Sequence, residues 1–144
     1  LTKTNYKMKK IIAVVFVFLL SISCSNEQTL PPVRYVLVPI QNVEIPEVMY
    51  VGTTYNIVVE YQKLSSCHGF DGFYYQTNGF TKTISVQNFV VEKSDCQTFT
   101  DQVISENMSF HPTEPGTYLF KFWKGKDSNT NDIFLEFERT IETN

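Results

Sequence analysis

Apolar and polar side chains alternate with a period of two along most of the chain after Val33. Successive side chains of a β-strand point to opposite faces of a sheet, so this period predicts strands with one face on a core. No segment after Cys24 keeps a helical period, and 15% of the residues are aromatic, which also favours β-structure. The alternation is clearest near the C-terminus, where its apolar positions are Tyr118, Phe120, Phe122, Ile133, Leu135, Phe137 and Ile141.

The alternating segments are short and are separated by turn residues. The segment 43–51 contains Pro46, which cannot donate to a ladder, so we expect an edge strand or a broken strand there. This spacing predicts an all-β fold, an antiparallel immunoglobulin-like β-sandwich of about seven strands over residues 33–144. The other expected strands are 33–38, 54–62, 69–76, 80–92 (one strand or two), 102–110 and the two segments near the C-terminus.

A Gly-x-Tyr sequence follows a proline-containing turn, with Gly116 and Tyr118 directly after Pro115. It resembles the tyrosine corner of immunoglobulin-like domains, in which the tyrosine hydroxyl bonds to the backbone just upstream. We expect Tyr118 to form this bond. The alternative is a tyrosine that simply begins a strand.

The N-terminal region has the pattern of a secretory signal peptide over residues 1–23. Lys7, Lys9 and Lys10 precede an unbroken apolar run at 11–20, and this run is too short to span a bilayer as a helix. The alternative is a short buried helix, which the absence of a polar face disfavours. Met8 is a possible true start of translation.

The apolar run ends in small residues and a cysteine, Leu20-Ser21-Ile22-Ser23-Cys24, which resembles the lipobox of bacterial lipoproteins. The resemblance implies a lipid attached to Cys24, although Ser21 stands where the lipobox usually has leucine. Ordinary cleavage near Ser23, which leaves an unmodified cysteine, is the alternative. Residues 24–32 are polar and end in two prolines, so we expect a lipidated tether.

Charge narrows the possible partners. The chain has 12 basic and 15 acidic residues, and four of the lysines lie within residues 1–23. Cleavage there leaves 8 basic and 15 acidic residues, a net charge of −7, which argues against a nucleic-acid partner. We therefore expect membrane contact through the lipid anchor. The lipobox resemblance implies a place in the bacterial cell envelope, and we expect the outer membrane.

Several short motifs follow one another along the chain. They are the lipobox with Cys24, Gly52-Thr53-Thr54-Tyr55, Cys67-His68-Gly69-Phe70, Cys96, Phe110-His111-Pro112, Pro115-Gly116-Thr117-Tyr118 and Phe120-Lys121-Phe122-Trp123. Together they resemble small lipoproteins of Flavobacteria and other Bacteroidetes. The resemblance covers most of the chain after the signal peptide and implies an immunoglobulin-like sandwich on the cell envelope. It implies no activity.

Cys67 and Cys96 form an even pair in a chain that we expect to be exported. Export through an oxidising compartment predicts a disulfide between them, with two buried thiols as the alternative. Metal ligation by these cysteines with His68 lacks a supporting spacing, and we expect His111 to be a turn residue. The sequence therefore predicts no metal site at these residues.

The polar segment 127–132 partly fits a calcium-binding loop, with Asp127, Asn129 and Asn131 at the first three ligand positions. Asp132 stands where that loop needs glycine, and strand-like sequence follows, so a hairpin turn is favoured. No motif indicates a cofactor or catalytic residues. The predicted role is binding or scaffolding, with an envelope protein or a glycan as possible partner, and an enzyme is disfavoured.

A second hypothesis is an inhibitor of a secreted protease. The terminal hairpin around Phe122 and Trp123 resembles that of chagasin-like inhibitors, although their loop motifs are missing. An assay against papain-like proteases separates this hypothesis from simple binding.

A candidate binding face follows from the alternation. Asp71 is expected to face water, which places Phe73 and Tyr75 on the outer side of one sheet with Trp123 and Phe134. Contiguous exposed aromatic residues tend to mark interaction sites. A shift of one residue in the 73–75 segment would exchange the two faces, so the register remains open.

Overall fold

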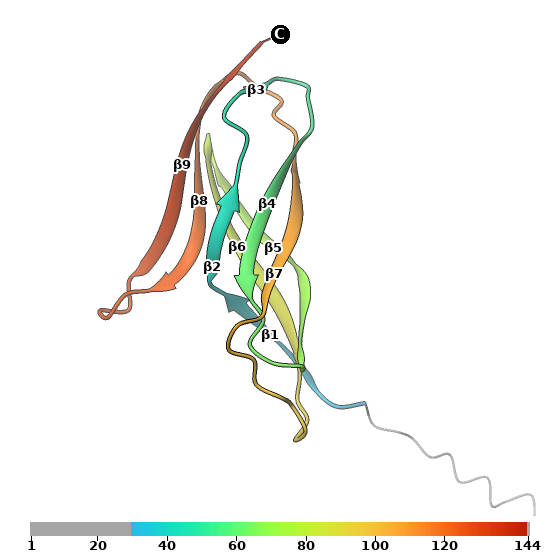
Figure 1. The fold of residues 1–144 in the computed structure, drawn as a ribbon. Helices are drawn as coiled ribbons and strands as arrows, with labels where there is room; N and C mark the ends of the chain where they lie inside the picture. Colours follow the sequence, from blue (N-terminus) through green and yellow to red (C-terminus); the bar gives the residue numbers. More distant parts are fainter. Residues whose placement is uncertain (1–29, 144) are drawn as a thin grey trace, which may run out of the picture. The chain divides into compact units, whose positions relative to one another are not determined.

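The structure is a computed structural model that describes residues 30–143. Pro31–Asn144 form one compact unit, in which two β-sheets pack on a shared core (Figure 1). The predicted all-β sandwich is therefore confirmed. The strands are β1 (Val33–Val38), β2 (Ile40–Glu44), β3 (Met49–Tyr50), β4 (Tyr55–Gln62), β5 (His68–Asn78), β6 (Thr81–Val91), β7 (Val103–Phe110), β8 (Gly116–Lys126) and β9 (Asp132–Glu142).

The larger sheet has the strand order β1-β6-β8-β9-β3, with β5 also paired to β6, and the smaller sheet has the order β2-β4-β7. Pro39 alone separates β1 from β2, so the chain crosses between sheets at a residue without a backbone N–H. Among the described strands, β5 pairs only with β6 and β7 pairs only with β4. Each sheet therefore keeps an open edge.

The strand count exceeds the predicted seven for local reasons. No strand was predicted directly after 33–38, but β2 begins at Ile40, and only Pro39 separates it from β1. The expected break at Pro46 is confirmed, because β2 ends at Glu44 and β3 begins at Met49. The segment 80–92 forms the single strand β6.

Two strand pairs are parallel, β3 with β9 and β6 with β8. The prediction of purely antiparallel sheets is wrong at these pairs. Parallel pairs need long connections, and a whole strand of the other sheet, β7, lies between β6 and β8 in the sequence. A local pattern of alternation therefore carries no information about them.

The core contains the residues that the alternation assigned to it. Tyr118, Phe120 and Phe122 are buried on β8, and Met108 and Phe110 are buried on β7. Facing rings pack edge to face across the two sheets. One assignment is wrong: Ile133 was expected to face inward, but its side chain is 39% exposed. Its partner in the ladder is Gly125, which has no side chain to cover it.

A β-bulge in β5 decides which aromatic residues face the core. It lies between Phe70 and Gly72 and inserts one extra residue, so the alternation shifts by one at this point. Phe70 and Phe73 consequently both pack against the core, with ring centroids 5.2 Å apart. Beyond the bulge, Gly79 with φ +57° occupies the first position of the two-residue turn into β6.

The predicted signal peptide at 1–23 and Cys24 lie outside the described residues, as does most of the predicted tether. In the part of the chain that the structure describes, no helix has the length and apolar character needed to span a bilayer.

Candidate functional site

A cleft of about 420 Å³ opens between the two sheets, on the side where β5 and β7 have their open edges. This volume is within the range of small-molecule binding sites. Because strands alternate, Phe73, Tyr75 and Thr77 on β5 present their side chains from one sheet. Met108 and Phe110 on β7 present theirs from the other.

Tyr118 is the central ring of the apolar wall. Its ring centroid lies 5.7 Å from that of Phe110 and 4.9 Å from that of Phe80, both edge to face. Its hydroxyl donates to the Glu114 carbonyl oxygen at 3.0 Å, so the bond expected of a tyrosine corner is confirmed. Burial raises the pKa of Tyr118, so the hydroxyl remains a neutral donor near pH 7. These contacts hold the wall in one conformation.

Lys82 supplies a positive charge to the cleft. Its Nζ lies 5.4 Å from the centroid of the Tyr118 ring and donates to the Gly79 carbonyl oxygen at 3.1 Å. In the described part of the chain, Lys82 forms no ion pair. The residues that line the cleft include no aspartate or glutamate. The cleft therefore carries a positive charge, although the net charge of the whole chain is negative.

Hydroxyl and imidazole groups form the rest of the polar lining. His111 lies in the loop between β7 and β8, as expected of a turn residue, with its Nδ1 3.1 Å from Thr54 Oγ1. This contact orients the ring at the edge of the cleft. The remaining polar residues of the lining are Thr77, Ser109 and Thr113.

The predicted aromatic face of four residues does not exist as one surface. Phe73 and Tyr75 lie opposite Val86 and Ile84 in the ladder, and residues directly opposite each other share a face. Since Val86 and Ile84 are buried in the core, Phe73 and Tyr75 are on the core side of the sheet. The β5 bulge is the physical reason for this correction. Both rings instead line the cleft.

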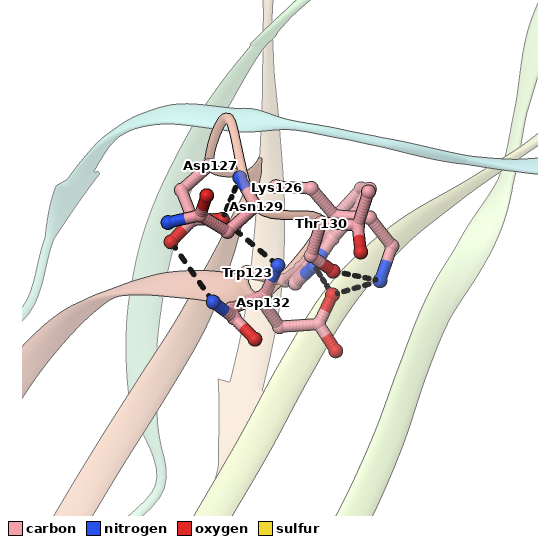
Figure 2. A network of polar contacts seen from close by, with 7 residues as sticks. Trp123, Lys126, Asp127, Asn129, Thr130 and Asp132 are labelled. Carbon is pink, nitrogen blue, oxygen red and sulfur yellow. Dashed lines mark hydrogen bonds and ion pairs between the residues drawn. The ribbon is translucent and has the colours of Figure 1, made fainter.

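Trp123 and Phe134 are on the outer face of the larger sheet, as predicted, and they are cross-strand neighbours. Trp123 Nε1 donates to Asp132 Oδ1 at 2.9 Å (Figure 2). The Lys121 ammonium lies 4.6 Å from the centroid of the Phe134 ring. Both rings are partly covered by these polar neighbours, and Phe73 and Tyr75 are not beside them.

Residues 127–131 of the polar segment form the turn between β8 and β9, and Asp132 begins β9. Asp127 Oδ1 accepts hydrogen bonds from the backbone N–H groups of Asn129 and Asn131, at 2.8 and 2.9 Å (Figure 2). The bonds from Asn131 lower the pKa of Asp127. The carboxylate thus holds the turn together, as the favoured hairpin interpretation requires. Within residues 30–143 no three His, Cys, Asp or Glu side chains are grouped as a metal site requires.

The predicted disulfide between Cys67 and Cys96 is confirmed, with a Cα–Cα distance of 5.5 Å. It joins the connection between β4 and β5 to the connection between β6 and β7. Backbone hydrogen bonds from Ser66 to Gln97 and from Phe99 to Leu64 run beside it. The bridge therefore fixes one end of the sandwich.

A contact between Ser65 and His68 was not predicted from the sequence. Ser65 Oγ lies 2.7 Å from His68 Nδ1 and accepts the backbone N–H of Cys67 at 3.2 Å. In a catalytic triad the serine lies at Nε2 and a carboxylate lies at Nδ1, so this contact has the opposite orientation. Its place beside the disulfide gives it a structural role in the turn that begins β5.

The cleft itself was also missed, because it forms where two open sheet edges meet. Lys82 and Met108 lie 26 positions apart in the sequence and on different sheets. The one available signal was the inward face of β7, on which Met108 and Phe110 alternate with polar residues. That signal does not say which strand of the other sheet lies opposite.

Comparisons of the chain with family models, with curated proteins and with solved structures found no match.

Proposed function

We propose that this protein is a non-enzymatic binding protein of the bacterial envelope, anchored by a lipid at Cys24. Its ligand site is the cleft between β5 and β7. The observation that carries this proposal is the composition of the cleft: a wall of aromatic side chains beside hydroxyl groups, an imidazole and one ammonium group. Small-molecule sites combine a largely apolar surface with a few placed polar groups in this way.

The anchor is supported by the basic start, the apolar run and the small residues before Cys24. The Cys67–Cys96 disulfide is consistent with export, since disulfides persist in oxidising compartments. Lipoproteins carry at least two acyl chains, as stable anchoring by lipid requires. We place the protein at the outer membrane on the same sequence pattern.

We further infer that the sandwich is a variant of the immunoglobulin-like class. The Tyr118 bond to Glu114 supports this assignment. The variant departs at its two parallel pairs, β6 with β8 and β3 with β9, because the sheets of an immunoglobulin domain are antiparallel.

A binding role fits the hydrogen-bond contacts of the two histidines in the chain. The Nδ1 of His68 contacts a serine hydroxyl, and the Nδ1 of His111 contacts a threonine hydroxyl. General-base histidines usually have a carboxylate at that nitrogen, which fixes the tautomer and stabilises the charged ring. These two rings are instead arranged as structural hydrogen-bonding groups.

The test of the cleft is a screen of small-molecule fragments against the full chain, with Thr77→Trp as the blocked variant. Thr77 is exposed and lines the cleft, so an indole there should fill it without changing the core. Thr117→Trp is the matched control, because Thr117 is also exposed on a strand but is outside the lining. Fragments should bind the wild type and Thr117→Trp, and lose binding to Thr77→Trp. Equal binding to all three proteins would contradict the site.

The test of the anchor is metabolic labelling with a fatty-acid analogue in a bacterial host that processes lipoproteins. The wild type should be labelled and Cys24→Ala should not. Cys96→Ser is a control that keeps the lipobox and should be labelled like the wild type. Label on Cys24→Ala at the wild-type level would refute the anchor.

A further inference from the structure

We propose that the ligand of the cleft is an organic anion with a flat apolar ring, whose negative group pairs with the Lys82 ammonium. This inference rests on the proposed function and specifies the ligand class of that site. The ring would lie against the aromatic wall formed by Tyr75, Phe110 and Tyr118.

The charge of the lining supports an anion. The chain has more acidic than basic residues, yet the lining contains Lys82 and neither aspartate nor glutamate. An ammonium group has three donors, and the Gly79 carbonyl oxygen accepts one of them. A carboxylate or phosphate in the cleft would meet no like charge among the lining residues. It would form a charge-assisted hydrogen bond, the stronger kind.

Glu114 is the acidic group to consider as a competitor for Lys82. It lines a smaller hollow of about 310 Å³ that shares Lys82 and Tyr118 with the cleft. Its backbone carbonyl oxygen accepts the Tyr118 hydroxyl, but its carboxylate forms no ion pair with Lys82 in the described part of the chain. The Lys82 charge is thus not neutralised by a short ion pair with this neighbour.

The rings argue for a flat ligand and against a cationic one. Aromatic faces bind both flat apolar groups and cations. Here the Lys82 ammonium already lies near the Tyr118 ring, so a second cation would be repelled. The Thr77 hydroxyl and the His111 imidazole add hydrogen-bonding groups around the same space.

The experiment uses three probes with one ring and three charges at neutral pH: 3-phenylpropionate, 3-phenylpropanol and 3-phenylpropylamine. Binding of each to the full chain is measured by isothermal titration calorimetry at low salt. The propionate should bind about tenfold more tightly than the alcohol, as a charge-assisted bond implies, and the amine should bind most weakly. The preference should shrink at high salt.

Lys82→Met keeps the unbranched apolar stem of the side chain, one atom shorter, and removes its charge, and it should abolish the preference of the propionate over the alcohol. Lys124→Met is the matched control, since Lys124 is exposed and outside the lining, and it should keep the preference. Thermal unfolding of both variants checks that they fold. Equal affinities for the three probes would overturn the inference. So would the absence of propionate binding at 10 mM, since a dissociation constant of 10 mM corresponds to roughly 2.7 kcal/mol of binding free energy. The proposed cleft itself fails only if the broader fragment screen also finds no binding that Thr77→Trp removes.

Discussion

Some single residues do not follow the alternation of buried apolar and exposed polar side chains. Asn88 lies on the core face of β6 and is fully buried; its side chain lies beside the Tyr61 hydroxyl, but neither Nδ2 nor Oδ1 forms a hydrogen bond of good geometry among the described residues. A buried polar group without a partner costs free energy of folding. The alternation along β6 could not reveal this, because an asparagine in a strand is normally assigned to the solvent face.

We predict that Asn88→Leu raises the free energy of unfolding by about 1–3 kcal/mol, because leucine has nearly the shape of asparagine and no polar atoms. Urea unfolding measures the change. Asn88→Ala should gain less, since it leaves a cavity. A loss of more than about 1 kcal/mol in Asn88→Leu would show that the amide is satisfied and stabilising.

His68 should make stability depend on pH. Burial is the main cause that lowers its pKa, with the positive charges of Arg34 and Lys63 adding to it. The unfolded chain then takes up a proton near pH 6.5 while the folded chain does not, so stability should fall as pH drops below about 6.5. Asp127 and Asp132 have lowered pKa values, so their contribution is lost only at more acidic pH.

Urea unfolding between about pH 7.5 and 5 checks this prediction, with His68→Asn as the variant that removes the titrating group. The slope of stability against pH should be shallower in His68→Asn than in the wild type. Identical slopes would assign the dependence to other groups.

Elements of the fold were predictable where the alternation is unbroken and were mispredicted where a bulge interrupts it. The core faces of β4, of β7 and of β8 as far as Trp123 follow directly from period two. In β5 the bulge between Phe70 and Gly72 reverses the faces of everything that follows, including Phe73 and Tyr75. A bulge is one inserted residue, so its position depends on the partner strand and not on the sequence of the bulged strand alone.

The turn between β8 and β9 contains a conformation that threonine disfavours. Thr130 has φ +66°, in the left-handed region that suits glycine. Thr130→Gly should raise the free energy of unfolding by about 0.5–1 kcal/mol, because relief of the strain outweighs the extra entropy of the unfolded chain. Thr130→Val keeps the β-branch and should bring no such gain. Thermal unfolding of the three proteins checks this, and a destabilised Thr130→Gly would contradict it.

At the scale of the whole molecule, long-range pairings decide the architecture. The disulfide was predictable from export and the even cysteine count, but the parallel pairs and the cleft were not. Both depend on which distant segments meet, such as β6 with β8 and β5 with β7. Of the residues that line the cleft, only Phe73 and Tyr75 belonged to the predicted binding face, and they were assigned to the opposite face of the sheet.

Removal of the disulfide tests how much it constrains the fold. Its cysteines are 29 positions apart, and on the chain-entropy model such a loop contributes about 3–4 kcal/mol. The double variant Cys67→Ala with Cys96→Ala should lose about that much free energy of unfolding in urea, and the wild type under reducing conditions should lose a similar amount. A loss below about 1 kcal/mol would mean that the backbone bonds beside the bridge already fix this end of the sandwich.

The most direct test of the central claim, that the cleft between β5 and β7 is the binding site, is a methyl spectrum of methionine-labelled full chain with a bound fragment. Met108 lines the cleft, and Met49 is buried in the core outside its lining. The full chain also contains Met8, and substitution of Met49 and of Met108 by leucine in turn assigns their two signals among the three. Binding should move the Met108 signal and leave the Met49 signal in place, and Thr77→Trp should abolish the movement. A fragment that binds the chain without moving Met108 would contradict the account.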